Sequence, residues 1–351
     1  MTFLYVGAYT KPPQGRADGI GVYRFDPGSG TLDHVDTATD IVNPSFLAIS
    51  GDARFLYAVC EAEGGAVTAF ARDPKTGKLE ELNRQPTHGA GPCYVSIDNS
   101  GRYVLVANYG GGSIAVLPIA DDGSLQPATS AIQHEGSSVN PDRQQEAHAH
   151  MIAPAPDSRF VLATDLGMDE IITYKLGTDT GELTKSASTA SNPGAGPRHF
   201  AFAPNDQTVY VINELDSTLT VYAFDDATGH LDPHQTISAL PDGYSEESWC
   251  AQVVVSPDGR FVYGSNRGHD SIVTWSVDQE SGHLTTLGHT STEGSYPRNF
   301  TLDPTGAWLL VANQNSDNLV TFRRDAQTGL LSEPVSNVAM PSAVALVFAG
   351  A

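Results

Sequence analysis

Four side chains at widely separated positions in this sequence have the chemistry to bind an anion and to move protons. They are His150, Arg198, Glu214 and Arg298. The planar guanidinium of arginine pairs with carboxylates and phosphates, and histidine and glutamate are common proton-transfer groups. One such side chain at a strand end is more often structural than functional. The four therefore form a candidate site only if the fold brings them together.

An internal repeat indicates the fold that positions them, because three short motifs each occur seven times. The first motif is an inner-strand segment that starts at Pro44, Pro92, Ala149, Pro197, Cys250, Pro297 and Pro341. The second is a strand that starts at Phe3, Phe55, Tyr103, Phe160, Thr208, Phe261 and Trp308. The third is an alternating strand and turn that ends at Leu32, Leu79, Leu125, Leu183, Leu231, Leu284 and Leu331.

The leucines of the third motif are 46 to 58 residues apart, which suits a four-stranded propeller blade. β-Branched and aromatic runs alternate with turn residues, and no helical period is sustained. We predict an all-β fold, a seven-bladed β-propeller with four-stranded antiparallel blades, as a single domain over residues 1–351. The chain starts with the second motif and ends with the first. The C-terminal strand should therefore pair into the N-terminal blade and close the ring.

The repeat also aligns the candidate residues with one another. One position of the first motif is occupied by Ser45, Cys93, His150, Arg198, Ala251, Arg298 and Ser342. One position of the second motif is occupied by Tyr9, Glu61, Tyr109, Leu166, Glu214, Arg267 and Gln314. Antiparallel pairing places the end of the second strand beside the start of the first. Both sets are therefore predicted to meet at one mouth of the central channel, which suits a small anionic ligand.

We predict two groups of site residues at this mouth. The catalytic residues are His150, Glu214, Arg198 and Arg298. The substrate-binding residues are Arg198, Arg298, His148, Arg267, Glu61, Ser45 and Ser342. Two insertions, at 134–147 and 238–249, precede inner strands and should frame the same mouth. His199 follows Arg198 directly, so strand alternation predicts that it points to the opposite face and has a packing role.

Composition excludes several classes of partner. The formal net charge is −22, with 19 Lys and Arg against 41 Asp and Glu, so nucleic acid and anionic membranes are not expected partners. The N-terminus lacks a signal-peptide pattern and no apolar run is long enough to span a membrane, which predicts a cytoplasmic protein. The His148-x-His150 pair lacks further ligands, so neither a metal nor a cofactor is expected. A monomer or weak homo-oligomer is predicted.

At these residues the chain resembles the seven-bladed β-propeller lactonase family, which includes propeller-type 6-phosphogluconolactonases and fungal carboxymuconate-lactonizing enzymes. The likeness covers the whole chain and is most specific in GPRH at 196–199, NEL at 213–215, YPRN at 296–299 and the histidine of AHM at 149–151. The resemblance implies His150, Arg198, Glu214 and Arg298 as the active-site set. His148 is an alternative to His150, although the register from the following turn favours His150.

The resemblance implies a lactonase that hydrolyses a small anionic sugar lactone, with 6-phosphogluconolactone of the pentose phosphate pathway as the expected substrate. Arg198 and Arg298 would hold the phosphate or carboxylate of the substrate, and one of them would also face the developing oxyanion. Either Glu214 or His150 would activate water, and the other would protonate the leaving ring oxygen. The alternatives are a muconate-lactonizing cycloisomerase and a non-catalytic propeller that serves as an interaction scaffold.

Overall fold

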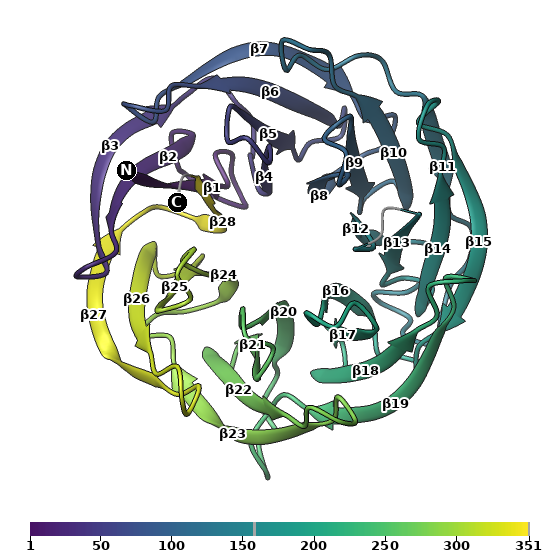
Figure 1. The fold of residues 1–351 in the computed structure, drawn as a ribbon, viewed down its shortest axis with the longest axis vertical. Coiled ribbons are helices and arrows are strands. Elements are labelled where there is room, and N and C mark those ends of the chain that lie inside the picture. The colour runs from purple at the N-terminus through teal and green to yellow at the C-terminus, as the bar shows by residue number, and fades with distance from the viewer. Residues whose placement is uncertain (157–158, 350–351) are drawn as a thin grey trace.

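The computed structural model describes residues 1–156 and 159–349 and folds them into a closed ring of seven four-stranded antiparallel sheets. Each sheet is one blade, with its first strand at the central channel and its last strand at the outer rim (Figure 1). The described residues contain 28 strands. The predicted all-β, seven-bladed propeller with four-stranded antiparallel blades is confirmed.

The blade that holds both chain ends has the order β28–β1–β2–β3. Its strands are β28 (Ala343–Ala349), β1 (Thr2–Ala8), β2 (Ile20–Asp26) and β3 (Thr31–Ala38). The next three blades, from the channel outward, are β4 (Leu47–Ile49), β5 (Phe55–Cys60), β6 (Ala66–Arg72) and β7 (Leu79–Pro86); β8 (Pro92–Ile97), β9 (Tyr103–Asn108), β10 (Ser113–Pro118) and β11 (Ser130–Gln133); and β12 (Ala149–Pro154), β13 (Phe160–Asp165), β14 (Glu170–Leu176) and β15 (Leu183–Ala190).

The last three blades follow the same outward order. They consist of β16 (Pro197–Phe202), β17 (Thr208–Asn213), β18 (Thr218–Phe224) and β19 (Leu231–Ser238); β20 (Trp249–Val255), β21 (Phe261–Arg267), β22 (Ser271–Val277) and β23 (Leu284–Ser291); and β24 (Pro297–Leu302), β25 (Trp308–Asn313), β26 (Asn318–Arg324) and β27 (Leu331–Ala339).

The C-terminal strand closes the ring, as predicted. β28 pairs antiparallel with β1, with Val347 opposite Tyr5 and Leu346 opposite Val6. Figure 1 shows the two ends of the chain side by side in this blade. Backbone hydrogen bonds therefore join the first and last segments of the chain, and this pairing closes the ring.

Neighbouring blades are joined by a recurring contact between a turn glycine and an aromatic residue. Gly77, in the turn before β7, has a φ of 77°, and its Cα lies so close to Phe3 of the previous blade that an added Cβ would be 2.6 Å from the ring. The Tyr5 hydroxyl donates a 2.7 Å hydrogen bond to the Gly77 carbonyl. Gly30 meets Trp308, and Gly329 meets Phe261, in the same way. These turns need glycine both for the backbone angle and for the close approach.

A one-residue bulge near the start of the inner strands positions the site. The pairing register shifts across Cys93 in β8, His150 in β12, Arg198 in β16 and Arg298 in β24. In each case the residue inside the shift is the one that the repeat aligned. Bulges re-aim side chains and often occur next to active sites. Here the bulge brings the extra side chain to the channel and breaks the strict alternation of faces.

The glycine contact predicts a difference between two substitutions. Gly77→Ala and Gly101→Ala both place a side chain at positive φ, but nothing lies within 4 Å of an added Cβ at Gly101. Gly77→Ala should lower the free energy of unfolding by about 1–3 kcal/mol more than Gly101→Ala, because it also clashes with Phe3. Urea denaturation of the two variants measures this difference. Equal losses would show that the inter-blade contact is not tight.

Candidate active site

The centre of the site is the Glu214 carboxylate, which follows β17 and is only 4% exposed. Its Oε2 accepts hydrogen bonds of 2.8 Å from Arg198 Nε and 2.8 Å from Arg267 Nη2. Its Oε1 accepts a 2.8 Å hydrogen bond from Arg143 Nη2. One buried carboxylate therefore binds three guanidinium groups from three separate parts of the chain.

Glu214 is held in its ionised form. Burial by itself raises the pKa of the carboxyl, but the guanidinium groups of Arg267 and Arg198 outweigh burial and hold the pKa well below its ordinary value. Both carboxylate oxygens are occupied by charge-assisted hydrogen bonds, which are stronger than neutral ones. Glu214 is therefore suited to position arginines and poorly suited to take up a proton.

Arg143 is a site residue that the sequence analysis missed. It lies in the insertion at 134–147 and reaches both Glu214 and the Tyr109 hydroxyl, to which its Nη2 donates at 3.0 Å. The repeat could not find it, because inserted residues have no counterpart in the other blades. The available signal was an arginine in an insertion beside the predicted mouth, in a chain with few cations.

The insertion is anchored at its start by a buried polar chain. His134 Nδ1 lies 2.7 Å from Asp165 Oδ2, and His134 Nε2 lies 2.9 Å from the Tyr174 hydroxyl. Ser138 donates to Asp169 further along. The backbone that carries Arg143 is thus fixed to β13, to β14 and to the turn between them. The Arg143 side chain itself is 34% exposed, the most open of the three that bind Glu214.

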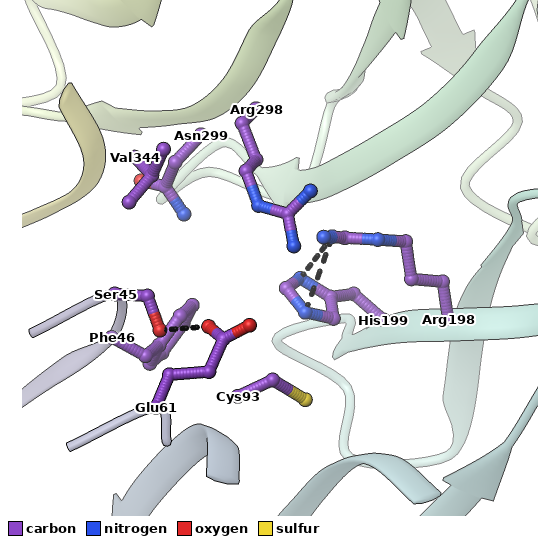
Figure 2. A pocket seen from close by; sticks show the side chains of 9 residues that line it. All are labelled: Ser45, Phe46, Glu61, Cys93, Arg198, His199, Arg298, Asn299 and Val344. Carbon is purple, nitrogen blue, oxygen red and sulfur yellow. Dashed lines mark hydrogen bonds between the residues drawn. The ribbon is translucent and has the colours of Figure 1, made fainter. Parts of the chain in front are cut away.

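A small cavity lies in the channel beside these ion pairs. It measures about 10 Å³, which is room for about one water molecule. Figure 2 shows its lining residues, which are Ser45, Phe46, Glu61, Cys93, Arg198, His199, Arg298, Asn299 and Val344. A sugar lactone does not fit this volume, so a substrate of that size requires side chains at the mouth to move.

Arg298 and Arg198 converge on one side of the cavity (Figure 2). Burial together with the positive charges of Arg267 and Arg298 lowers the pKa of Arg198 to about 9. Arg298 forms no hydrogen bond or ion pair within the described residues, and its guanidinium lies 5.7 Å from the centre of the Tyr9 ring. Crowded guanidinium groups with unused donors favour an anion between them.

Glu61, predicted to bind substrate, follows β5 and lines the opposite side of the cavity (Figure 2). Its Oε2 accepts a hydrogen bond from Ser45, and the Tyr9 hydroxyl lies 3.1 Å from Oε2 and 3.2 Å from Oε1. Burial raises the pKa of this carboxyl, although Arg298 opposes the rise. The two carboxyl groups of the mouth therefore have opposite environments.

His150 is buried and neutral. Burial, and then the positive charge of Arg198, lower the pKa of its imidazole well below the ordinary value. The His150 ring makes edge-to-face contact with Tyr109, with centroids 5.4 Å apart. His148 stacks on the same tyrosine with centroids 4.5 Å apart, and its Nδ1 lies 2.9 Å from the Tyr109 carbonyl. Tyr109 thus contacts both histidines of the HAHM segment.

The predicted position of His199 is wrong. His199 lines the cavity together with Arg198 and packs its ring 5.1 Å from that of His150. The bulge at Arg198 accounts for this, because an extra residue between two paired positions interrupts the alternation of faces. The imidazole also has a polar partner, the side-chain oxygen of Gln252.

Ser342 does not lie where the sequence alignment placed it. Its Oγ accepts a 3.2 Å hydrogen bond from the Arg16 amide, and its own amide donates to Asp317. Val344 lines the cavity in its place. The pairing of β28 with β1 carries the bulge at Val344, two residues later than the turn-based alignment indicated. The C-terminal strand still contributes to the cavity wall, but with an apolar side chain.

Three further observations concern metal binding, membrane-spanning helices and the thiol of Cys93. Among residues 1–156 and 159–349, no group of three or more histidine, cysteine, aspartate or glutamate side chains is arranged to hold a metal ion. Within the same residues, no helix is long and apolar enough to cross a membrane. Cys93, which lies 3.7 Å from His150 Nδ1, has its pKa raised by burial and remains a thiol.

The whole propeller, including the site, matches a known family. Residues 3–348 fit the family model described as lactonase, 7-bladed beta-propeller. The chain belongs to this lactonase family. It is 39% identical over 297 residues to the 6-phosphogluconolactonase of Bacillus subtilis, covering 84% of this chain and 83% of that protein. It is 35% identical over 310 residues to the 6-phosphogluconolactonase of Formosa agariphila, covering 85% and 86%.

A solved structure agrees with the family assignment. The periplasmic gluconolactonase of Pseudomonas aeruginosa superimposes with a TM-score of 0.94 at 35% identity, over 100% of this chain and 99% of that one. The resemblance drawn from the GPRH, NEL, YPRN and AHM segments is therefore confirmed at the level of the lactonase family.

The lactonase-family protein should lose stability in a pH-dependent way when Glu214 is neutralised. Its folded-state pKa lies below the ordinary value of 4.5, so its contribution is complete above about pH 4.5 and is lost as pH falls through the folded pKa. At pH 7, Glu214→Gln should cost about 3–5 kcal/mol, because three guanidiniums lose their partner. Urea denaturation from pH 7 down to pH 3 measures the cost.

The difference between wild type and Glu214→Gln should shrink below about pH 4.5. The exposed carboxyl of Glu135 supplies the control, and Glu135→Gln should behave like wild type throughout. A cost for Glu214→Gln that stays constant over the whole pH range would contradict the ion-pair account.

Proposed function

We propose that this protein hydrolyses a small phosphorylated sugar lactone to the corresponding hydroxy acid, with 6-phosphogluconolactone as the substrate and 6-phosphogluconate as the product. The observation that carries the proposal is the charge of the channel mouth. Four arginines, Arg143, Arg198, Arg267 and Arg298, gather around two carboxyl groups in a chain of net charge −22. Two relatives named 6-phosphogluconolactonase support the choice of lactone.

The geometry suggests how such a substrate lies in the channel. Its phosphate points outward to Arg143, the most exposed arginine on Glu214. Its lactone carbonyl lies deeper, where Arg298 and Arg198 face the oxygen that becomes negative when water attacks. In this arrangement the Arg143 side chain exchanges Glu214 for the phosphate.

His150 is the better candidate for activating water. It is neutral, and only a neutral imidazole can accept a proton. Glu214 holds the arginines in place instead, because all of its hydrogen bonds come from guanidinium groups. The sequence left open which of His150 and Glu214 activates water, and we assign this role to His150.

The other predicted functions have less support. A muconate-lactonizing cycloisomerase could use the same arginines on carboxylates, but the relatives named above are lactone-hydrolysing enzymes by name. An interaction scaffold has no use for buried ion pairs around a channel mouth. The cytoplasmic location stays a prediction, and the Pseudomonas neighbour is named periplasmic.

The proposal is tested by assaying the purified protein on 6-phosphogluconolactone, with spontaneous hydrolysis subtracted. Arg198→Ala and Glu214→Gln should each lower kcat/KM by roughly 100-fold or more, because each disturbs the charges that stabilise the oxyanion. Arg54→Ala is the control, because Arg54 is an exposed arginine at the opposite end of β5 from Glu61. Near-normal turnover in both site variants would refute the assignment, and activity on a muconolactone alone would establish the alternative.

Arg143 should determine selectivity for the phosphate. Arg143→Gln should raise KM about tenfold for 6-phosphogluconolactone, because it removes a charge-assisted hydrogen bond to the phosphate. KM for unphosphorylated gluconolactone should change little. Parallel Michaelis–Menten curves on the two lactones measure the effect, with Arg143→Lys expected to recover part of the selectivity. Equal changes on both substrates would mean that Arg143 only supports the fold of the mouth.

A further inference from the structure

Ring opening of a lactone requires a proton donor for the ring oxygen, and the roles proposed above do not include one. When the bond between the acyl carbon and the ring oxygen breaks, that oxygen leaves as an alkoxide unless a proton reaches it. His150 is engaged with the attacking water, and Glu214 is occupied by three guanidiniums. Besides the arginines, the titratable groups that line the cavity are Glu61, Cys93 and His199, and one of them has to serve the leaving oxygen.

Glu61 is the carboxyl group that the fold places there. Figure 2 shows its carboxyl pointing into the cavity, opposite Arg198 and Arg298. Within the described residues it forms no ion pair with an arginine, in contrast to Glu214. Ser45 donates to Oε2 only, and Oε1 has just the 3.2 Å contact with Tyr9. Oε1 is therefore the atom free to carry a proton.

We propose that Glu61 is a catalytic residue that donates a proton from Oε1 to the lactone ring oxygen as the ring opens. The proposal rests on the proposed function and assigns Glu61 a reaction step in place of its predicted role in substrate binding. The two carboxyl groups at the mouth thus divide the work, one fixed in place by cations and the other carrying a proton. Such pairs, with environments that push their pKa values apart, are typical of acid–base sites.

The surroundings of Glu61 support a carboxyl that changes its protonation state. The titratable, charged and hydroxyl groups that share the cavity with Glu61 or contact its carboxyl are Tyr9, Ser45, Cys93, Arg198, His199 and Arg298. Burial favours the protonated acid, whereas Arg298 and the Ser45 hydroxyl favour the carboxylate that remains after donation. Because these effects oppose each other, both the protonated acid and the carboxylate of Glu61 are accessible during the reaction.

The protons of the reaction balance. Water loses one proton to His150 and forms a bond from its oxygen to the acyl carbon. The bond from that carbon to the ring oxygen breaks, and the ring oxygen takes the Glu61 proton. The products are a carboxylic acid on the substrate, the Glu61 carboxylate and protonated His150. Transfer of the His150 proton back to Glu61 restores the enzyme, and the product acid ionises in water.

The first test compares Glu61→Gln with Glu63→Gln, which alters an exposed carboxyl two residues away. Glu61→Gln should lower kcat by roughly 100- to 10,000-fold with KM within a few-fold of wild type, because glutamine cannot donate an acidic proton. Glu63→Gln should match wild type. Circular dichroism and melting temperature establish that both variants fold. A folded Glu61→Gln variant with kcat within threefold of wild type overturns the proposal.

The second test uses the pH profile and needs no loss of Glu61. A general acid works only when protonated, so kcat should fall as pH rises through the pKa of Glu61. Ser45→Ala removes a hydrogen bond that favours the carboxylate, and should move this basic limb to higher pH. A purely structural role for Ser45 would lower kcat at every pH and leave the limb in place. An unmoved limb counts against the proposal.

A third measurement separates this proposal from the proposed function. Infrared difference spectra recorded across a pH titration report the carbonyl stretch of a protonated carboxylic acid without any substrate. A band that persists above the pH at which ordinary carboxyls ionise, and that is missing in Glu61→Gln, supports a proton on Glu61. Wild-type protein that shows the band but turns over no lactone refutes the function alone. Active wild type without the band refutes the role of Glu61.

Discussion

The structure of the site depends on one carboxylate that must neutralise several buried arginines. Removing a charge from water is costly unless it is paired and hydrogen-bonded. Glu214 meets that requirement for Arg198, Arg267 and Arg143, which come from β16, β21 and the insertion at 134–147. Because one carboxylate cannot fully offset the guanidinium groups around it, the mouth keeps a positive excess inside an acidic protein. That excess makes the site suitable for an anion.

The propeller supplies the means to gather these charges. A bulged residue stands at the start of the inner strands β8, β12, β16 and β24, and the side chains of Arg198 and Arg298 reach the same cavity although 100 positions separate them. The ring itself is held by tight contacts between blades, such as Gly77 against Phe3, and by β28 completing the first blade. A rigid ring of this kind fixes the backbone that carries Arg198 and Arg298 before any ligand arrives, which favours electrostatic stabilisation, while side chains at the mouth such as Arg143 move to admit the substrate.

The candidate site was predictable where the repeat applies and unpredictable where it does not. Of the aligned residues, Arg198 and Glu61 line the cavity, Glu214 pairs with Arg198, and His150 packs against the ring of His199. Arg143 escaped, because an insertion has no aligned counterpart. The predicted positions of His199 and Ser342 were wrong. A bulge changes the face of the sheet to which a side chain points, and no local sequence pattern indicated the bulges.

The sequence by itself determined the number of blades, the closure of the ring and the family. Three motifs occur seven times each, and the chain starts with the second motif and ends with the first, so the last strand has to complete the first blade. Only the tertiary structure decided the protonation state of each carboxyl group at the mouth. Glu214 and Glu61 occupy the same motif position. Glu214 is hydrogen-bonded by guanidinium groups, whereas Glu61 is hydrogen-bonded by the hydroxyl groups of Ser45 and Tyr9. The burial and the protonation state of each carboxyl depend on neighbouring residues from other blades, and the sequence of a single repeat does not reveal the distances to those neighbours.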